Sequence, residues 1–134
     1  MVITVCRNDR CRYLCLMAIV FGEPEAGACI AALKAEDNVL ISAGSLAESL
    51  IVSARRNVAA ELAELVHGLG FQVVSVTPAS ARRIAQAYHE WGKGVHPAGL
   101  NFGDCFAYEV AKTQGCRLLY VGDDFAKTDI ASVL

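Results

Sequence analysis

The sequence has no long hydrophobic segment, although hydrophobic residues make up 54% of its 134 positions. Its longest uninterrupted apolar run, Leu14–Phe21, has eight residues, whereas a helix that crosses a membrane needs about 20. The run leads directly into Gly-Glu-Pro-Glu rather than into a small-residue cleavage site, which is untypical of a signal peptide. We therefore expect a cytoplasmic protein that has no membrane partner.

The sequence also lacks a strong net charge. Twelve Lys and Arg residues against fourteen Asp and Glu residues give a formal charge of −2. A protein that binds nucleic acid over a broad surface is usually basic, so only a local basic face is compatible with this balance. The high apolar fraction excludes intrinsic disorder. With no internal repeat and no low-complexity segment, the length predicts a single domain over residues 1–134.

Six cysteines are many for a chain of this size, but they lack the spacing of a metal site. Three lie within residues 1–15 and three are scattered singly through apolar neighbourhoods. A zinc site normally uses Cys-x2–4-Cys pairs, and no second pair or close His completes such a set here. We expect mostly buried thiols and keep zinc as a minor alternative. The six are Cys6, Cys11, Cys15, Cys29, Cys105 and Cys116.

Strand and helix patterns alternate along the chain. Short apolar runs predict buried strands at Asn38–Ser42, Phe71–Val76 and Arg117–Val121. Apolar positions at helical spacing predict helices around and between them. The predicted helices begin near Glu23, Ser45, Val58, Thr77 and Asp104. Strands that alternate with helices form a parallel sheet covered on both faces, so we expect a three-layer α/β/α sandwich with a central parallel sheet.

Acidic residues stand close to the ends of these predicted strands. Glu48 lies on the helix after the first strand, and Asp104 lies in the first turn of the helix before the last one. Asp123 and Asp124 follow the last strand directly. Such groups gather at the carboxyl edge of a parallel sheet, where Mg²⁺ or Mn²⁺ would relieve their mutual repulsion. Each acid alone also has an ordinary alternative as a helix cap, a solvated side chain or a turn residue.

Two segments near the C-terminus contain specific motifs. Leu100–Lys112 includes Gly-Asp-Cys-Phe-Ala-Tyr, and Leu118–Ile130 includes Gly-Asp-Asp-Phe. Both segments resemble the signatures of the PIN-domain ribonucleases, specifically the VapC toxins of VapBC toxin–antitoxin modules. The resemblance spans roughly Met17 to the C-terminus, and it is strengthened by Ile19–Glu25, Ser42–Glu48 and Tyr88–Gly94. The fold of that family is the α/β/α sandwich expected above.

The resemblance implies a function and a set of site residues. It implies the toxin of a type II toxin–antitoxin module, which is an endoribonuclease that hydrolyses RNA phosphodiester bonds with Mg²⁺ or Mn²⁺. Carried over by position, Glu48, Asp104 and Asp124 are the catalytic and metal-binding acids. The resemblance further implies a VapB-type antitoxin as partner, structured RNA such as tRNA or rRNA as substrate, and a homodimer.

Residues 1–16 are atypical of that family, whose strongest residue is an Asp near position five. The corresponding position falls on Thr4 when counted from the start and on Arg12 when counted back from Ile19. Neither side chain replaces a carboxylate ligand, and Arg12 would repel a cation. Asp9 is the only acid nearby, and it would serve only in a slipped strand. We therefore expect impaired cleavage; the alternative is a catalytically degenerate PIN domain that acts as an antitoxin-binding or regulatory protein.

Candidate RNA contacts lie outside the acidic cluster. The glycine-rich segment Gly92–Gly103 is either a flexible connector or an RNA contact, with Lys93 and His96 as the phosphate-binding candidates. Two arginine pairs have a similar ambiguity, because paired arginines on a helix are more often solvated than bound to RNA. These pairs are Arg55-Arg56 and Arg82-Arg83.

Overall fold

The computed structural model describes residues 3–7, 10–14, 19–24, 26–34, 38–115 and 125–130, with backbone alone in the first two ranges. The strands are β1 (Ile3–Arg7), β2 (Arg10–Leu14), β3 (Asn38–Ser42) and β4 (Gln72–Val74). The helices are α2 (Ala26–Lys34), α3 (Ala43–Arg55), α4 (Ala59–Leu69), α5 (Pro78–Trp91) and α6 (Phe102–Gln114), with a 3-10 helix η1 (Phe125–Lys127).

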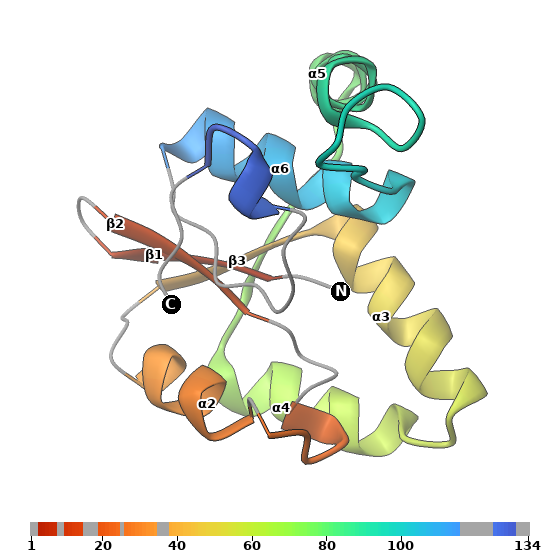
Figure 1. Cartoon of the computed structure of the whole chain (residues 1–134). Helices are drawn as coiled ribbons and strands as arrows, with labels where there is room; N and C mark the ends of the chain where they lie inside the picture. Colours follow the sequence, from red (N-terminus) through yellow and green to blue (C-terminus); the bar gives the residue numbers. More distant parts are fainter. Residues whose placement is uncertain are drawn as a thin grey trace.

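The described strands form one sheet in the order β2-β1-β3-β4. β3 and β4 are parallel, as expected for strands joined through helices. β1 and β2 form an antiparallel hairpin, and β1 also pairs antiparallel with β3; the sequence did not predict this hairpin. The strand expected at Arg117–Val121 lies outside the described residues. Figure 1 shows α2 and α4 on one side of the sheet and α5 and α6 on the other, which is the α/β/α arrangement.

The core lies between this sheet and its helices. β3 has the boundaries predicted for it, and its Val39, Leu40 and Ile41 are all buried, as a continuous apolar strand covered on both faces requires. α6 contributes the longest buried stretch, from Ala107 to Ala111. Cys29 is fully buried as well. None of the described helices is long and apolar enough to cross a membrane.

Polar side chains at the helix ends determine where the helices start. Ser42 is both the last residue of β3 and the N-cap of α3, since its Oγ accepts a hydrogen bond from the Gly44 N–H at 3.2 Å. α3 therefore begins two residues before the predicted Ser45. Thr77 caps α5 with Pro78 in its first turn, as predicted.

Gly70 ends α4 in the left-handed conformation, with φ of 62°, which glycine adopts without strain.

Candidate functional site

Asp104 is held at the start of α6 by a reciprocal pair of hydrogen bonds. The Asp104 N–H donates to the Asn101 side chain at 2.8 Å, and the Asn101 N–H donates to Asp104 Oδ2 at 3.0 Å. This capping box starts α6 at Phe102, two residues before the predicted start. The ordinary alternative for Asp104, a helix cap, is thus confirmed, but capping does not exclude a metal-binding role. A carboxylate has about four acceptor positions, so the cap orients the group without saturating it.

Glu48 reaches the same helix end from α3. Its carboxylate lies where the Cβ of a side chain at position 103 would be, so Gly103 makes room for it. Because Gly103 directly precedes Asp104, the structure places the Glu48 carboxylate of α3 against the residue next to the second predicted acid. Figure 1 shows the first turn of α6 next to the start of α3.

A second glycine allows α3 and α6 to approach closely. The ring of Phe106, one turn into α6, lies where a Cβ at Gly44 would be. Two positions without side chains, Gly44 on α3 and Gly103 on α6, therefore set the distance between the helices. This pairing could not be predicted from the sequence, because a glycine inside a helix gives no sign of the residue it contacts.

A hollow of about 420 Å³ opens beside Glu48 between α3 and α6. We call it the α3–α6 hollow. Its lining includes the Glu48 carboxylate, the Arg55 guanidinium, and exposed apolar side chains. Its lining residues include Glu48, Ile51, Arg55, Phe102, Gly103 and Phe106.

The other predicted acids, Asp9, Asp123 and Asp124, lie outside the described residues. Within the described part of the chain, no three His, Cys, Asp or Glu side chains are grouped so that they could hold a metal ion. The described portion of the candidate metal site thus consists of Glu48 and Asp104. Two carboxylates supply the oxygen donors that Mg²⁺ and Mn²⁺ prefer, and this donor set fits such a cation.

Cys105 follows Asp104, but its thiol is not suited to act as a nucleophile or as a metal ligand. Its side chain is fully buried, and that burial, with a further contribution from the negative charge of Asp104, raises its pKa to about 11. The thiol therefore stays protonated at neutral pH, and a protonated thiol is neither a nucleophile nor a good metal ligand. For Cys29 and Cys105, the expectation of buried thiols is confirmed.

Comparison with known proteins identifies the family. Residues 15–131 match the PIN domain family. The chain belongs to this family. It is 40% identical over 121 residues to ribonuclease VapC30 of Mycobacterium tuberculosis, covering 88% of this chain and 92% of that protein. It is also 41% identical over 120 residues to ribonuclease VapC42 of the same species (86% and 91% covered). Ribonuclease VapC of Mycolicibacterium smegmatis is 37% identical over 121 residues (88% and 94% covered).

The PIN-domain match begins at residue 15, so the hairpin of β1 and β2 precedes it. Both positions considered for the family's first acid lie in this hairpin. Thr4 lies on β1, the strand next to β3, whereas Arg12 lies on β2 opposite Val5 and is separated from β3 by β1. Neither of the two positions holds an acid.

A hydrogen-bonded chain joins the middle of α6 to the segment after η1 of this PIN domain. Trp91 Nε1 donates to the Tyr108 hydroxyl at 2.9 Å, and that hydroxyl donates to Asp129 Oδ1 at 2.7 Å. Lys112 Nζ donates to Asp129 Oδ2 at 2.8 Å. Burial, followed by the bond to Asp129, raises the pKa of Tyr108 far above its usual value. This network was not predicted from the sequence, although Asp129 lies within the Leu118–Ile130 motif.

The candidate RNA contacts in the glycine-rich segment lie in a loop that is closed by backbone hydrogen bonds. The Lys93 N–H donates to the Leu100 carbonyl, and the Leu100 N–H donates to the Trp91 carbonyl. His96 Nδ1 accepts from the Ala98 N–H at 3.0 Å, and its ring packs edge-on against Trp91 with centroids 4.7 Å apart. His96 thus has a structural role in the loop, whereas the Lys93 side chain is exposed. Both readings of this segment, a flexible connector and an RNA contact through Lys93 or His96, stay predictions.

The two arginines of the Arg82-Arg83 pair differ in the structure. Arg83 donates through Nε to Glu109 Oε1 at 2.9 Å, and its terminal nitrogen lies at the same distance from that oxygen. Glu109 is only 6% exposed and also accepts from the Thr113 hydroxyl. Both arginines are exposed, but only Arg83 is ion-paired among the described residues, and this pair links α5 to α6.

Proposed function

We propose that this chain is the toxin of a VapBC-type toxin–antitoxin module and acts as a metal-dependent endoribonuclease. The main structural support is the position of the Glu48 carboxylate at Gly103, next to Asp104, in a chain of the PIN-domain family. Relatives that are about 40% identical over most of both chains are named VapC ribonucleases. The described residues thus include the PIN-domain fold and two of the acids proposed for the metal site, Glu48 and Asp104.

Glu48, Asp104 and Asp124 would hold Mg²⁺ or Mn²⁺. When bound, such a cation activates water and stabilises negative charge on a phosphoryl oxygen. The chain's own residues prepare the site: Gly103 leaves space for the Glu48 carboxylate, and the Asn101 cap orients Asp104.

The partners follow from the same family relationship. We propose a VapB-type antitoxin, a structured RNA substrate such as tRNA or rRNA, and a homodimer. Exposed apolar side chains away from the acids are candidates for the protein contacts, because exposed apolar surface often marks an interface. Leu50, Val73 and Val95 are examples, with exposed fractions of 48%, 50% and 60%.

We further propose that cleavage by this chain is impaired. The PIN-domain match excludes residues 1–14, and neither Thr4 nor Arg12 can replace the Asp that the family has in its first strand. A site with fewer carboxylates binds a divalent cation more weakly. The alternative, a degenerate domain that only binds its antitoxin, is favoured by the same observation.

The test is RNA cleavage by the full chain with Mg²⁺, with Mn²⁺ and with EDTA. We expect weak, EDTA-sensitive cleavage that is lost in Asp104→Asn and Glu48→Gln but kept in Glu61→Gln, which changes an exposed acid on α4. Thr4→Asp or Arg12→Asp should increase it.

Two results would contradict parts of this proposal. Full activity that neither acid variant lowers would exclude the assigned site. No cleavage by the parent chain or by either Asp-restored variant would favour the antitoxin-binding alternative.

A further inference from the structure

Phe102 is unusually exposed for an aromatic residue beside a candidate catalytic site. Its side chain is 68% exposed, the largest value among the large hydrophobic residues whose side chains are described. It is the first residue of α6 and directly precedes Gly103, against which the Glu48 carboxylate lies. Folding normally buries such a side chain, and neither the proposed metal site nor the core uses it.

The Phe102 ring is braced in its exposed position. It packs edge-to-face against Phe106, with ring centroids 4.8 Å apart and an interplanar angle of 78°. Phe106 in turn lies against Gly44 of α3. Because this contact limits the mobility of the ring, a planar ligand stacking on Phe102 would lose little side-chain entropy on binding.

Charged groups of opposite sign line the α3–α6 hollow beside Phe102. Glu48 and Arg55 both line it and lie seven positions apart on α3, a rise of about 10 Å along the helix axis. Arg55 has no ion-pair partner among the residues that the structure describes. Ile51 and Phe102, both exposed, also line the hollow. The hollow thus combines the proposed metal-binding acid, an apolar surface with an aromatic ring, and an unpaired cation.

We propose that the α3–α6 hollow is a subsite for one nucleotide of single-stranded RNA next to the scissile phosphate. The base stacks on Phe102, and a backbone phosphate pairs with Arg55. This inference rests on the proposed function. Stacking on an aromatic side chain combined with a cation for the phosphate is the usual way in which proteins hold unpaired RNA. Since every base offers a π-face, we expect the subsite to tolerate different bases.

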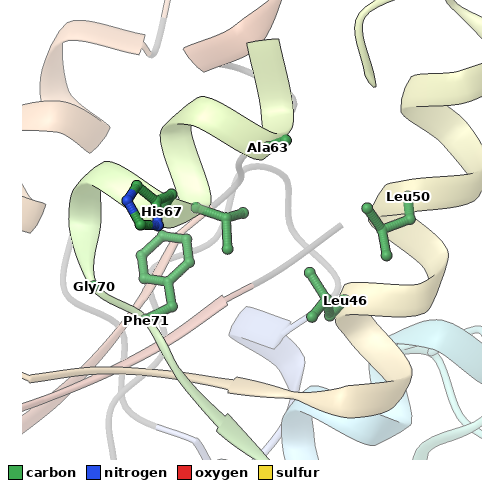
Figure 2. Close-up of a pocket in the computed structure, with 7 residues that line it drawn as sticks. Leu46, Leu50, Ala63, His67, Gly70 and Phe71 are labelled. Atoms are coloured by element: carbon green, nitrogen blue, oxygen red, sulfur yellow. The ribbon is translucent and has the colours of Figure 1, made fainter. Parts of the chain in front are cut away.

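A second hollow on α3 provides the contrast. It lies between α3, α4 and the start of β4 and has about the same size, 430 Å³. Figure 2 shows Leu46 and Leu50 of α3 on one side of it and His67 and Phe71 on the other. Among the residues that the structure describes, no Asp, Glu, Lys or Arg lines this α3–α4 hollow. Its described lining offers no Lys or Arg to pair with a phosphate, so we assign no RNA to it.

The experiment measures RNA binding in EDTA, where cleavage does not interfere. The probe is a short fluorescent single-stranded RNA, and the readout is its anisotropy. We expect Phe102→Leu, which keeps the apolar character but not the ring, to weaken binding about five-fold or more, and Phe102→Trp to retain it. Arg55→Gln should weaken binding and reduce its salt dependence, because one phosphate contact is lost. His67→Ala, which changes an exposed residue of the α3–α4 hollow, should bind as the parent chain does.

Each contrary result has a defined meaning. Equal RNA affinity of the parent chain and Phe102→Leu, with the same melting temperature, would overturn the subsite while leaving the cleavage proposal intact. No RNA binding by the parent chain at low salt would contradict the proposed function as well. If Phe102→Leu leaves RNA binding unchanged and converts a dimer to a monomer in sedimentation, the same face binds a second copy of the chain and not RNA.

Discussion

The carboxylate of Glu48 occupies the space that a side chain at Gly103 would fill. This relationship joins two helices that are distant in the sequence, and it places one candidate metal-binding acid against the residue that precedes the other. The geometry also means that the requirement for glycine at position 103 comes from packing, because Gly103 has no positive φ. Helix stability and metal binding should therefore respond differently to a change at this position.

Gly103→Ala should lower metal affinity without unfolding the protein. The added methyl group displaces the Glu48 carboxylate, whose flexible side chain can rotate away, while alanine stabilises a helix by up to about 1 kcal/mol relative to glycine. We expect weaker Mn²⁺ binding in calorimetry together with an unchanged or higher melting temperature. Gly27→Ala is the matched control, since Gly27 lies in α2 with no atom near its missing Cβ. Unchanged Mn²⁺ affinity in Gly103→Ala would remove Glu48 from the site.

Ser45→Ala should stabilise the protein. Ser45 is 2% exposed, and its Oγ has no hydrogen-bond partner in the described structure. A buried hydroxyl without a partner costs free energy, so its removal should raise the free energy of unfolding in urea by on the order of 1 kcal/mol. Ser49→Ala, one turn later, is the control with the opposite sign, because Ser49 Oγ donates to the Ser45 carbonyl at 2.8 Å. A loss of stability in Ser45→Ala would show that the hydroxyl is needed.

Local patterns predicted β3, β4 and the helices, but they missed the β1–β2 hairpin and the starts of two helices. β3 is correct at both ends because polar Asn38 and Ser42 bound its buried apolar residues. The starts of α3 and α6 were wrong by two residues each. In both cases a polar residue that the pattern placed before the helix, Ser42 or Asn101, caps it by a side-chain hydrogen bond. Periodicity of apolar residues contains no information about such caps.

Long-range contacts account for what the sequence could not show. The order of the predicted strands pointed to Glu48 and Asp104 as candidate metal-binding acids, and the family resemblance selected the same two. Neither source revealed that Gly103 makes room for the Glu48 carboxylate. The network around Tyr108 depends on Asp129 and Trp91, which lie on opposite sides of it in the sequence. The role of Asp124 stays a prediction, because it lies outside the described residues.

Arg83→Ala should destabilise the protein, whereas Arg82→Ala should not. Removing Arg83 leaves the buried Glu109 carboxylate with the Thr113 hydroxyl as its other hydrogen-bond donor, which should cost about 2 kcal/mol in urea unfolding. Arg82 is exposed, so its removal should change stability by less than about 0.5 kcal/mol. RNA affinity should stay the same in Arg83→Ala. Equal stabilities of the two variants would contradict the structural role of Arg83.

The contribution of Asp129 to stability should depend on pH. Burial by itself raises the pKa of Asp129, but hydrogen bonds from Lys112 and Tyr108 outweigh it and hold that pKa below the usual 3.8. A carboxyl group with a lowered pKa stabilises the fold above its unfolded-state pKa, and this stabilisation is lost as the pH falls through the folded-state pKa. The free energy of unfolding of the parent chain should therefore exceed that of Asp129→Asn most clearly at neutral pH.

That difference should narrow as the pH falls below about 4, the ordinary range of an Asp carboxyl group. Urea titrations of both proteins from neutral pH to about pH 3 measure it directly. Tyr108→Phe is the matched comparison, because it removes one donor while Lys112 continues to pair with Asp129; it should reduce the pH dependence without abolishing it. A difference between the parent chain and Asp129→Asn that stays constant with pH would mean that Asp129 stabilises the fold by packing rather than by its charge.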